Sequence, residues 1–143
     1  MSTLTKTARL PRRDVQRAVE LVLDGIKRYN SSPLMRWAKF RSITNKASRF
    51  ILLWEQKTLV GFLMYRTEGK MCYVYEIHVE ASHRSGGRGQ QMFNELFSSM
   101  KGFILILFVH RGNHGAIRLY ERNEFEIDPH YESNTYYRMA KFN

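Results

Sequence analysis

The sequence is poor in cysteine, proline and long apolar runs. Its single cysteine, Cys72, cannot form a disulfide within the chain or a cysteine-rich metal site, so a reducing compartment fits. The longest unbroken apolar run, Phe103–Val109, is far too short to span a membrane. The N-terminus lacks the apolar segment of a secretory signal. These absences argue against disulfide scaffolds, cysteine-based metal proteins and membrane-spanning proteins, and we expect a cytoplasmic or nuclear location.

Acidic residues are scarce in the N-terminal third. Residues 1–49 hold 12 Lys and Arg but only 3 Asp and Glu, a net charge of +9, whereas residues 50–143 are nearly balanced at +1. The first 13 residues are basic, acid-free and rich in Ser and Thr, which is also typical of a mitochondrial presequence, although the segment is short for one. A basic block suggests an anionic partner, such as RNA, a ribosome or a phosphate-bearing cofactor. A solvated helix face is the competing interpretation.

The remaining composition is that of an ordinary globular protein. Hydrophobic residues make up 43% of the chain and charged residues 25%. A chain of 143 residues is long enough for one real core, and it contains no repeats, low-complexity tracts or linker. We therefore expect a single domain over residues 1–143, in the form of a monomer.

The spacing of apolar residues predicts ten helices and strands. Helices are expected over residues 14–30, 33–42, 90–100 and 113–123. Strands are expected over residues 49–55, 58–66, 71–80, 103–109, 125–128 and 136–142. The order is ααβββαβαββ, in which antiparallel hairpins come first and a βαβ unit follows. This order predicts an α/β fold with a central, mixed and mostly antiparallel sheet that carries helices on both faces.

A glycine-rich loop, VEASHRSGGRGQ over residues 79–90, joins an apolar strand to a helix. Glycine tolerates a positive φ, so successive backbone N–H groups can turn toward one point. The following helix adds free N–H donors and the positive end of its dipole. This combination favours a site for a phosphate or pyrophosphate. A plain strand-to-helix turn with solvated arginines is the alternative.

Two motifs around this loop resemble those of the GNAT superfamily of acetyltransferases. The phosphate-loop motif Arg/Gln-x-x-Gly-x-Gly/Ala is matched by Arg84, Gly87 and Gly89, with an additional Gly86. The motif Asn-x-x-Ala-x-x-x-Tyr, on the helix after the next strand, is matched by Asn113, Ala116 and Tyr120. The loop contains no G-x-G-x-x-G and no Gly-Lys-Ser/Thr, so Rossmann and Walker A loops do not fit. The resemblance implies the GNAT fold and acetyl-CoA as the acetyl donor, without a metal.

Longer stretches are similar to the NatD class of N-terminal α-acetyltransferases, which modify core histones. These are YVYEIHVE (73–80) and NHGAIRLYERNEFEID (113–128), preceded by Tyr29 and Trp37. The similarity covers roughly residues 29–142. The chain departs from that class in a shorter turn around Glu68, a trimmed segment 128–136 and a shorter N-terminal extension. The resemblance implies that the acceptor is a protein N-terminus of the core-histone type.

The resemblance also implies which residues hold acetyl-CoA. The backbone of a strand segment would bind the pantetheine arm: His78, Val79 and Glu80. The N–H groups of the loop would face the pyrophosphate: Gly86, Gly87, Arg88, Gly89, Gln90 and Gln91. Arg84 and Arg88 could add charge-assisted contacts. Asn113 would bond the pantetheine, although Asn is also a common helix N-cap.

Two residues are expected to carry the chemistry. Tyr120 would protonate the leaving thiolate, and Glu76 is the candidate base, acting directly or through a water. We expect partial burial to raise the pKa of Glu76 toward a useful range. Strict alternation would place Glu76 on the strand face opposite Tyr73, Tyr75, Ile77 and Val79, unless a β-bulge intervenes. An outward carboxylate that balances nearby Arg or Lys is the competing interpretation.

Three tyrosines are expected to line a peptide slot: Tyr29, Tyr75 and Tyr137. Each could instead belong to the core. The carboxylates of Glu68, Glu76 and Glu80 could receive a basic tail. We expect Trp37 to serve packing, and the five histidines show no spacing that indicates a metal site.

Two other functions remain open on the sequence. The same fold could acetylate a lysine or a small-molecule amine. The chain could also be a noncatalytic RNA-binding module, although its aromatics are not interleaved with the basic block as stacking platforms would be.

Overall fold

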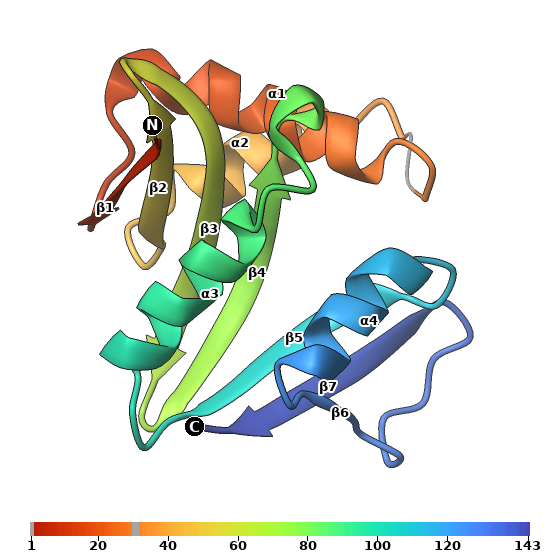
Figure 1. Cartoon of the computed structure of the whole chain (residues 1–143). Coiled ribbons are helices and arrows are strands. Elements are labelled where there is room, and N and C mark those ends of the chain that lie inside the picture. Colours follow the sequence, from red (N-terminus) through yellow and green to blue (C-terminus); the bar gives the residue numbers. More distant parts are fainter. Residues whose placement is uncertain (1, 30–31) are drawn as a thin grey trace.

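A computed structural model describes residues 2–29 and 32–143 of the chain, which form one seven-stranded mixed sheet with helices on both faces (Figure 1). The strand order is β1-β2-β3-β4-β5-β7-β6. The strands are β1 (Ser2–Thr7), β2 (Arg49–Glu55), β3 (Thr58–Glu68), β4 (Met71–Val79), β5 (Ile104–His110), β6 (Glu126–Ile127) and β7 (Tyr136–Phe142). The helices are α1 (Val15–Ile26), α2 (Met35–Ile43), α3 (Arg88–Ser99) and α4 (His114–Arg122), with short 3-10 turns at Arg12–Asp14 and Ala81–His83.

The predicted fold class is therefore confirmed, and one strand is added to the predicted order. Strands 49–55 and 136–142 have the predicted bounds, strands 58–66 and 71–80 begin where predicted, and the remaining ends move by one to four residues. The end expected for the first helix, Asn30, lies outside the described residues. The strand that the sequence did not predict is β1, which pairs antiparallel with β2 at the edge of the sheet. Its six residues contain one apolar side chain, Leu4, so no apolar period marks it.

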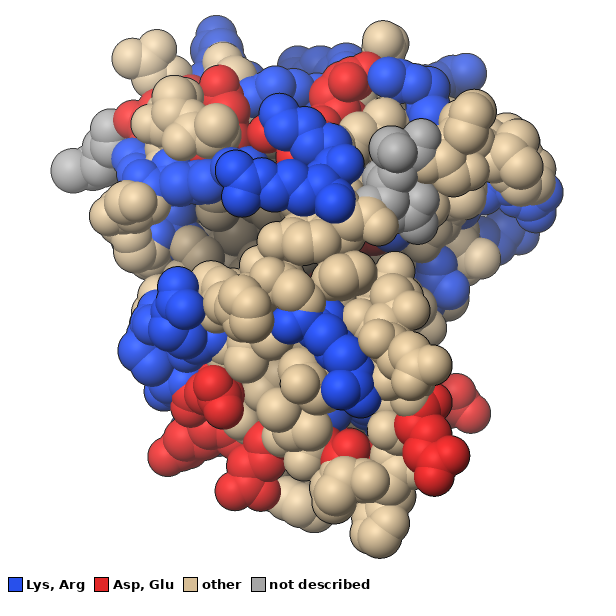
Figure 2. Space-filling view, turned by 90° about the vertical axis from the view of Figure 1, so that its right-hand side faces the viewer, with Lys and Arg blue, Asp and Glu red and all other residues tan. Residues whose placement is uncertain are grey.

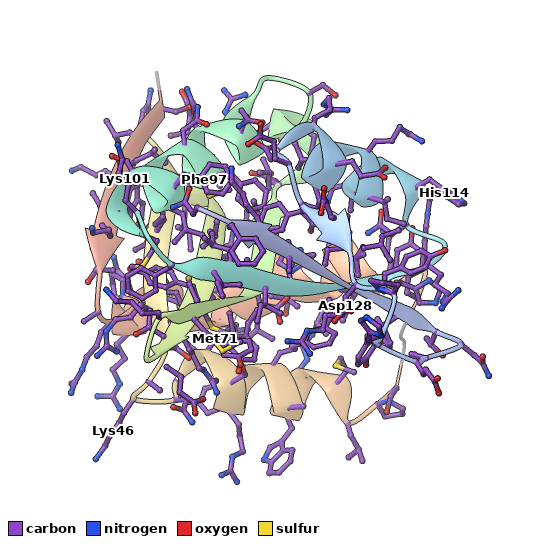
Figure 3. The ribbon with its side chains drawn as sticks, turned by 90° about the horizontal axis from the view of Figure 1, so that it is seen from below. Lys46, Met71, Phe97, Lys101, His114 and Asp128 are labelled. Atoms are coloured by element: carbon purple, nitrogen blue, oxygen red, sulfur yellow. The ribbon has the colours of Figure 1, made fainter. Side chains whose placement is uncertain are left out.

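Two apolar cores, one on each face of the sheet, hold these layers together. One face packs against α1 and α2 through Val19, Val22 and Ile43. The other face packs against α3 and α4 through Phe93 and Tyr120. Seen from below, α2 lies on one side of the sheet, while α3 and α4 lie on the other (Figure 3). The expectation of helices on both faces is confirmed.

The sheet opens between its two central strands. β4 and β5 are parallel neighbours only from Met71–Val74 and Ile104–Leu107. Beyond these pairs the strands diverge, and no ladder joins them in the part of the chain that the structure describes (Figure 1). The backbone edge of β4 from Tyr75 to Val79 is therefore left without a partner on the β5 side. A polar backbone edge inside the molecule calls for hydrogen-bonding partners, which a ligand can supply.

A β-bulge in β4 lies at the point where the strands part. Met64 of β3 pairs with Glu76, and the next residue, Tyr65, pairs with Val74, so Tyr75 is the extra residue. Cys72 and Val74 face the core under α3 and α4, and Ile77 and Val79 pack against the same core. The bulge therefore shifts the alternation by one residue. It turns Glu76 toward the face covered by α1 and α2.

Candidate active site

A cleft of about 850 Å³ occupies the opening between β4 and β5. Its walls come from the end of α1, α2, the outer half of β4, the glycine loop, the end of β5 and α4. Figure 2 looks at the side of the molecule where the two strands diverge, and the surface is hollowed between an upper and a lower part. Lys and Arg are abundant in the upper part, and Asp and Glu gather at the bottom. The cleft therefore lies where the sheet itself is incomplete.

Most of the residues expected from the sequence meet in this cleft. They are Tyr29, Tyr75, Glu76, His78, Val79, Arg84, Gly87, Arg88, Gly89, Gln90, Asn113 and Tyr120. They come from segments up to 91 residues apart in the chain, which only the tertiary structure brings together.

Glu76 is a buried carboxylate with both oxygens engaged. Its side chain is 6% exposed. One oxygen, Oε1, lies 2.7 Å from Nε2 of His78, and Oε2 accepts a hydrogen bond of 2.6 Å from Nζ of Lys39 on α2. His78 is itself held under α1, where a Cβ at Gly25 would come within 2.4 Å of its Nδ1. The bulge and this close helix approach together orient the carboxylate toward the closed end of the cleft.

The expected rise in the pKa of Glu76 is wrong. Burial does raise the pKa of this carboxyl, because desolvation disfavours the charged form, and it is the largest single influence. The contacts with His78 and Lys39 together outweigh burial and hold the pKa below its ordinary value of 4.5. Glu76 is therefore ionised at neutral pH. The competing interpretation, a carboxylate that balances a nearby cation, is correct for its Lys39 contact, although the side chain does not point outward.

Tyr120 lies in the same cleft, on α4. Its ring packs edge-on against Phe93, with centroids 5.8 Å apart, and against Phe125. Burial, and then the charge of Glu76, raise the pKa of its phenol above the ordinary value of 10. The hydroxyl therefore keeps its proton at neutral pH, which is the state that a proton donor requires. Phe93 and Phe125 fix the ring, and Glu76 is close enough to act on its charge.

The glycine loop ends in a helix N-terminus that no side chain caps. Gly87 stands at the N-cap of α3 with φ +74°, a left-handed conformation that glycine adopts without strain. The first N–H groups of a helix have no acceptor within it, so those of Arg88, Gly89 and Gln90 are available to an anion. Gly89 also leaves room, since a Cβ there would only touch Leu119 at 3.8 Å. The loop therefore fits a pyrophosphate.

The guanidinium groups of both loop arginines form hydrogen bonds with other parts of the protein. Arg84 donates to the carbonyl of Val79 at 2.9 Å and contacts Asp24 of α1 at 3.3 Å. Arg88 donates to the carbonyl of His83 at 3.1 Å and to the hydroxyl of Ser2 at 3.2 Å. These bonds brace the loop against α1 and β1. The expected direct contacts of both arginines with the pyrophosphate stay predictions.

Asn113 and Gln90 both have structural partners in the cleft wall. The side-chain oxygen of Asn113 accepts the N–H of Ala116 at 3.3 Å and caps α4. Gln90 forms a two-way amide pair with Asn123 at 2.6 and 2.9 Å, which joins α3 to α4. The N-cap interpretation of Asn113 is thus correct, and its expected bond with the pantetheine stays a prediction.

Aromatic rings form the wall of the cleft opposite the glycine loop. The Tyr29 ring stacks on His110 with centroids 4.6 Å apart, and Tyr136 meets His110 edge-on at 5.7 Å. Tyr75, the bulged residue, is 48% exposed, and the guanidinium of Arg66 lies 4.5 Å from the centre of its ring. Nδ1 of His110 accepts the N–H of Gly112 at 3.0 Å, so the neutral ring carries its proton on Nε2 and presents a donor. Such a wall suits a peptide backbone.

Tyr136, and not Tyr137, completes this wall. The two residues are adjacent on β7 and point to opposite faces of the sheet. Tyr136 pairs with His110 across the ladder, whereas Tyr137 packs against the core and lies under Arg111, 4.4 Å from its guanidinium. The residue of β7 in the cleft wall is therefore Tyr136, and the expectation for Tyr137 is corrected. The sequence of this strand does not show which of its two faces lies toward the cleft.

Four other expected residues lie outside the cleft wall. Glu68 is exposed at the β3–β4 turn, beyond the paired ends of β4 and β5 and away from the opening. Glu80 pairs with Arg17 at 3.0 Å and ties the loop to α1. Gly86 is not among the residues that line the cleft, and the N–H of Gln91 is donated to the carbonyl of Gly87 within α3. The structure places Glu68 away from the cleft and engages the Gln91 N–H within α3, and their expected roles in tail binding and pyrophosphate binding stay predictions.

Sequence reasoning missed several residues of the site and misplaced one. It missed the roles of Gly25, Lys39, His110 and Tyr136. Lys39 looked like part of the basic block, and no local pattern marks a lysine whose side chain contacts a residue on a distant strand.

Trp37 was expected to serve packing. It is 61% exposed on α2, beside a separate hollow of about 740 Å³ between α1 and α2.

The described residues contain no cluster of three His, Cys, Asp or Glu side chains that could bind a metal ion. No helix among them is both long and apolar enough to cross a bilayer.

A splayed parallel strand pair, an uncapped glycine-loop helix and a buried acid–tyrosine pair together define a CoA-thioester-dependent transferase. The chain belongs to the acetyltransferase (GNAT) family, whose family profile matches residues 17–125. A search of curated proteins finds no match.

Solved structures of similar fold cover almost the whole chain. They include the PaiA N-acetyltransferase of Thermoplasma acidophilum in complex with coenzyme A, with 17% identity, a TM-score of 0.79 and 99% of each chain covered. The ribosomal-protein-S18-alanine N-acetyltransferase of Escherichia coli has 20% identity and a TM-score of 0.76, with 98% of this chain and 92% of that chain covered. NAA60 of Arabidopsis thaliana, with a bisubstrate analogue, has 18% identity and a TM-score of 0.74 over 98% of each chain. At these identities the similarity shows the fold.

Proposed function

We propose that this protein transfers an acetyl group from acetyl-CoA to the free α-amine at the N-terminus of a protein. The observation that carries the proposal is the placement of an ionised, buried Glu76 and a protonated Tyr120 in one cleft, at the point where β4 and β5 separate. Acetyl-CoA supplies an activated acetyl thioester. The unpaired edge of β4 and the N-terminus of α3 offer hydrogen bonds for its pantetheine and pyrophosphate, respectively.

A comparison of the pKa values of possible acceptor amines supports an α-amine. An α-amino group has a pKa near ~8, against ~10.4 for lysine, so roughly a tenth of it but well under a thousandth of lysine is free base at neutral pH. Glu76, with its lowered pKa, is a weak base. It suits an acceptor that needs little help to lose its proton, directly or through a water. Tyr120 then protonates the departing thiolate.

The acceptor enters from the side of the aromatic wall. Tyr29, His110 and Tyr136 offer flat surfaces and donors to a peptide, and the ionised Glu76 attracts its terminal ammonium. A core-histone-type tail, suggested by the sequence resemblance, is the acceptor we would test first. Contact of the basic residues 1–49 with RNA, the monomeric state and the cytoplasmic or nuclear location remain predictions.

The test compares matched peptides with free and chemically blocked N-termini, both of which contain lysine. Purified protein is incubated with acetyl-CoA and each peptide, and CoA release and the acetylated position are measured by thiol assay and mass spectrometry. We expect transfer to the α-amine of the free peptide alone. Equal transfer to the blocked peptide would contradict the proposal and favour a lysine or small-amine acceptor.

A panel of free peptides that differ in their first residues defines the acceptor further. A histone-type sequence that is acetylated no faster than unrelated sequences would remove the histone assignment while leaving N-terminal acetylation intact.

A further inference from the structure

One lysine of this chain lies inside the catalytic cleft. Lys39 is the only one of the eight lysines, all within the described residues, that lines the cleft. It projects from α2, and its side chain is 24% exposed, so it is partly enclosed and still open to the cavity. The others lie on the surface or at strand ends. Lys46, on the turn after α2, is an example at a distance from the cleft (Figure 3).

The amine of Lys39 lies next to the carboxylate proposed as the base. Its Nζ lies 2.6 Å from Oε2 of Glu76, the proposed base. Glu76 is two residues beyond Val74, the last residue of β4 that pairs with β5, so the contact lies near the closed end of the cleft. If the pyrophosphate is bound at α3 and the pantetheine lies along β4, the thioester reaches this same end. The second carboxylate oxygen is held by His78 at 2.7 Å, which keeps Glu76 in place.

We propose that Lys39 is a self-acetylation site, at which the protein transfers an acetyl group from its own bound acetyl-CoA to Nζ within one chain. This inference rests on the proposed acetyl transfer from acetyl-CoA, and it is independent of which external acceptor is used. The high pKa of a free lysine normally prevents attack at neutral pH. Glu76 is a weak base for such a proton, so the step depends on proximity: the contact of 2.6 Å holds Nζ in the cleft beside an acceptor for its proton, and each turnover uses the small free-base fraction.

The step balances as follows. The Lys39 ammonium gives a proton to Glu76, and the freed electron pair of Nζ forms a bond to the carbonyl carbon of the thioester. The carbon–sulfur bond breaks, and the thiolate takes the proton of Tyr120. The nitrogen loses its second proton to solvent as the amide forms, and Tyr120 recovers its proton from Glu76. One ammonium and one acetyl-CoA thus yield one acetyl-lysine, one CoA thiol and one released proton.

Acetylation would change the site as well as mark it. The ammonium becomes a neutral amide, so Glu76 loses the ion pair on Oε2 and is left with His78. Before modification, Lys39 competes with the terminal ammonium of a peptide for the same carboxylate. A free peptide in excess should therefore slow the acetylation of Lys39.

The experiment follows isotopically labelled acetyl-CoA, so that acetyl groups acquired during expression are not counted. The purified full-length protein is incubated alone, and label is mapped by peptide mass spectrometry. We expect label at Lys39 at least tenfold faster than at Lys46, with a rate constant that does not change on tenfold dilution of the protein. Lys39→Arg should remove the label, and Lys46→Arg should retain it at Lys39.

A second variant guards against misfolding of the first. Tyr120→Phe keeps Lys39 and should slow its labelling at least tenfold, whereas uncatalysed labelling of Lys46 should be unchanged. Equal labelling of Lys39 and Lys46, or a Lys39 rate that rises with protein concentration, would overturn the proposal. Parallel reactions of the same protein, one without peptide and one with it, separate the two hypotheses. Acetylated peptide in the second reaction with unlabelled Lys39 in the first overturns this inference alone, and labelled Lys39 in the first with unmodified peptide in the second overturns the N-terminal function alone. If neither is labelled, both fail.

Discussion

At the scale of single residues, the site depends on a carboxylate whose partners oppose the effect of burial. Glu76 would have a raised pKa if burial acted alone, but His78 and Lys39 hold the pKa below 4.5. Both contacts come from the face of the sheet that the bulge at Tyr75 selects. The charge state of Glu76, the candidate base, is therefore set by neighbours that are two and 37 residues away in sequence.

Replacement of Glu76 by Gln should lower kcat for peptide acetylation about 10²-fold, because general acid–base catalysis contributes about 10² to 10⁴ in rate. Binding of acetyl-CoA, measured by calorimetry, should be unchanged, because the pyrophosphate and pantetheine contacts lie elsewhere. Unchanged activity of Glu76→Gln between pH 6 and 8 would show that Glu76 is not the base.

Replacement of Lys39 by Met should raise the pKa of Glu76, because it removes a cation 2.6 Å away while His78 and the Tyr120 hydroxyl remain near it. The pKa of Glu76 is lower in the folded protein than its ordinary value of 4.5. The ionised carboxylate therefore stabilises the folded state above pH 4.5, and this contribution is lost as the pH falls through the folded-state pKa. Loss of the pair should cost about 1–3 kcal/mol at pH 7, because Oε2 of Glu76 is left without its hydrogen-bond donor while Oε1 keeps His78. The free energy of unfolding in urea should differ less between the parent protein and Lys39→Met below pH 4.5 than at pH 7. A difference that does not change with pH would contradict the ion pair between Lys39 and an ionised Glu76.

At the scale of elements, the position of α1 over β4 depends on one glycine. A Cβ at Gly25 would lie 2.4 Å from Nδ1 and 2.9 Å from Cε1 of His78. Any larger residue must move the helix or the imidazole, and the imidazole holds Glu76. The packing of α1 thereby acts on Glu76, the candidate base, through His78.

Gly25→Ala should therefore lower the free energy of unfolding by about 1–3 kcal/mol, the usual cost of overpacking. Gly115→Ala is the matched control, because it is also within a helix and a Cβ there meets nothing within 4 Å. That change should be neutral or stabilising by up to ~1 kcal/mol through helix propensity. Thermal unfolding of both variants is the measurement, and equal effects would show that the close approach to His78 is unimportant.

At the scale of the whole molecule, the sheet is open between β4 and β5. A ligand that bridges this opening should stabilise the folded protein. The two halves of the sheet are joined by four residue pairs between β4 and β5, beyond which the walls of the cleft face each other. A thioester ligand that bonds to β4, α3 and α4 would link these halves. The apolar core under α3 and α4 contains residues of both halves, such as Leu63 and Leu107, and joins them without a ligand.

Acetyl-CoA at about 100 times its Kd should stabilise the protein by ~2.7 kcal/mol, because it binds the folded state alone. A thermal-shift titration should show a concentration-dependent rise in Tm, and free CoA should reproduce most of it. Acetate alone should have no effect, since it lacks the pyrophosphate and pantetheine. The absence of any shift with acetyl-CoA would contradict the site and favour the noncatalytic RNA-binding alternative.

The sequence by itself determined the fold class and all the α-helices and strands except β1, and it predicted the donor site. Local chemistry sufficed there, because apolar periods, turn residues and the glycine loop with Arg84 and Gly87 act over a few neighbours. It did not reveal β1, since an edge strand with one apolar residue carries no period. Only the tertiary structure decided the bulge at Tyr75, the choice of Tyr136 over Tyr137, and the contact of Lys39 with Glu76. Each of these depends on register and on packing between distant segments, and no local pattern encodes them.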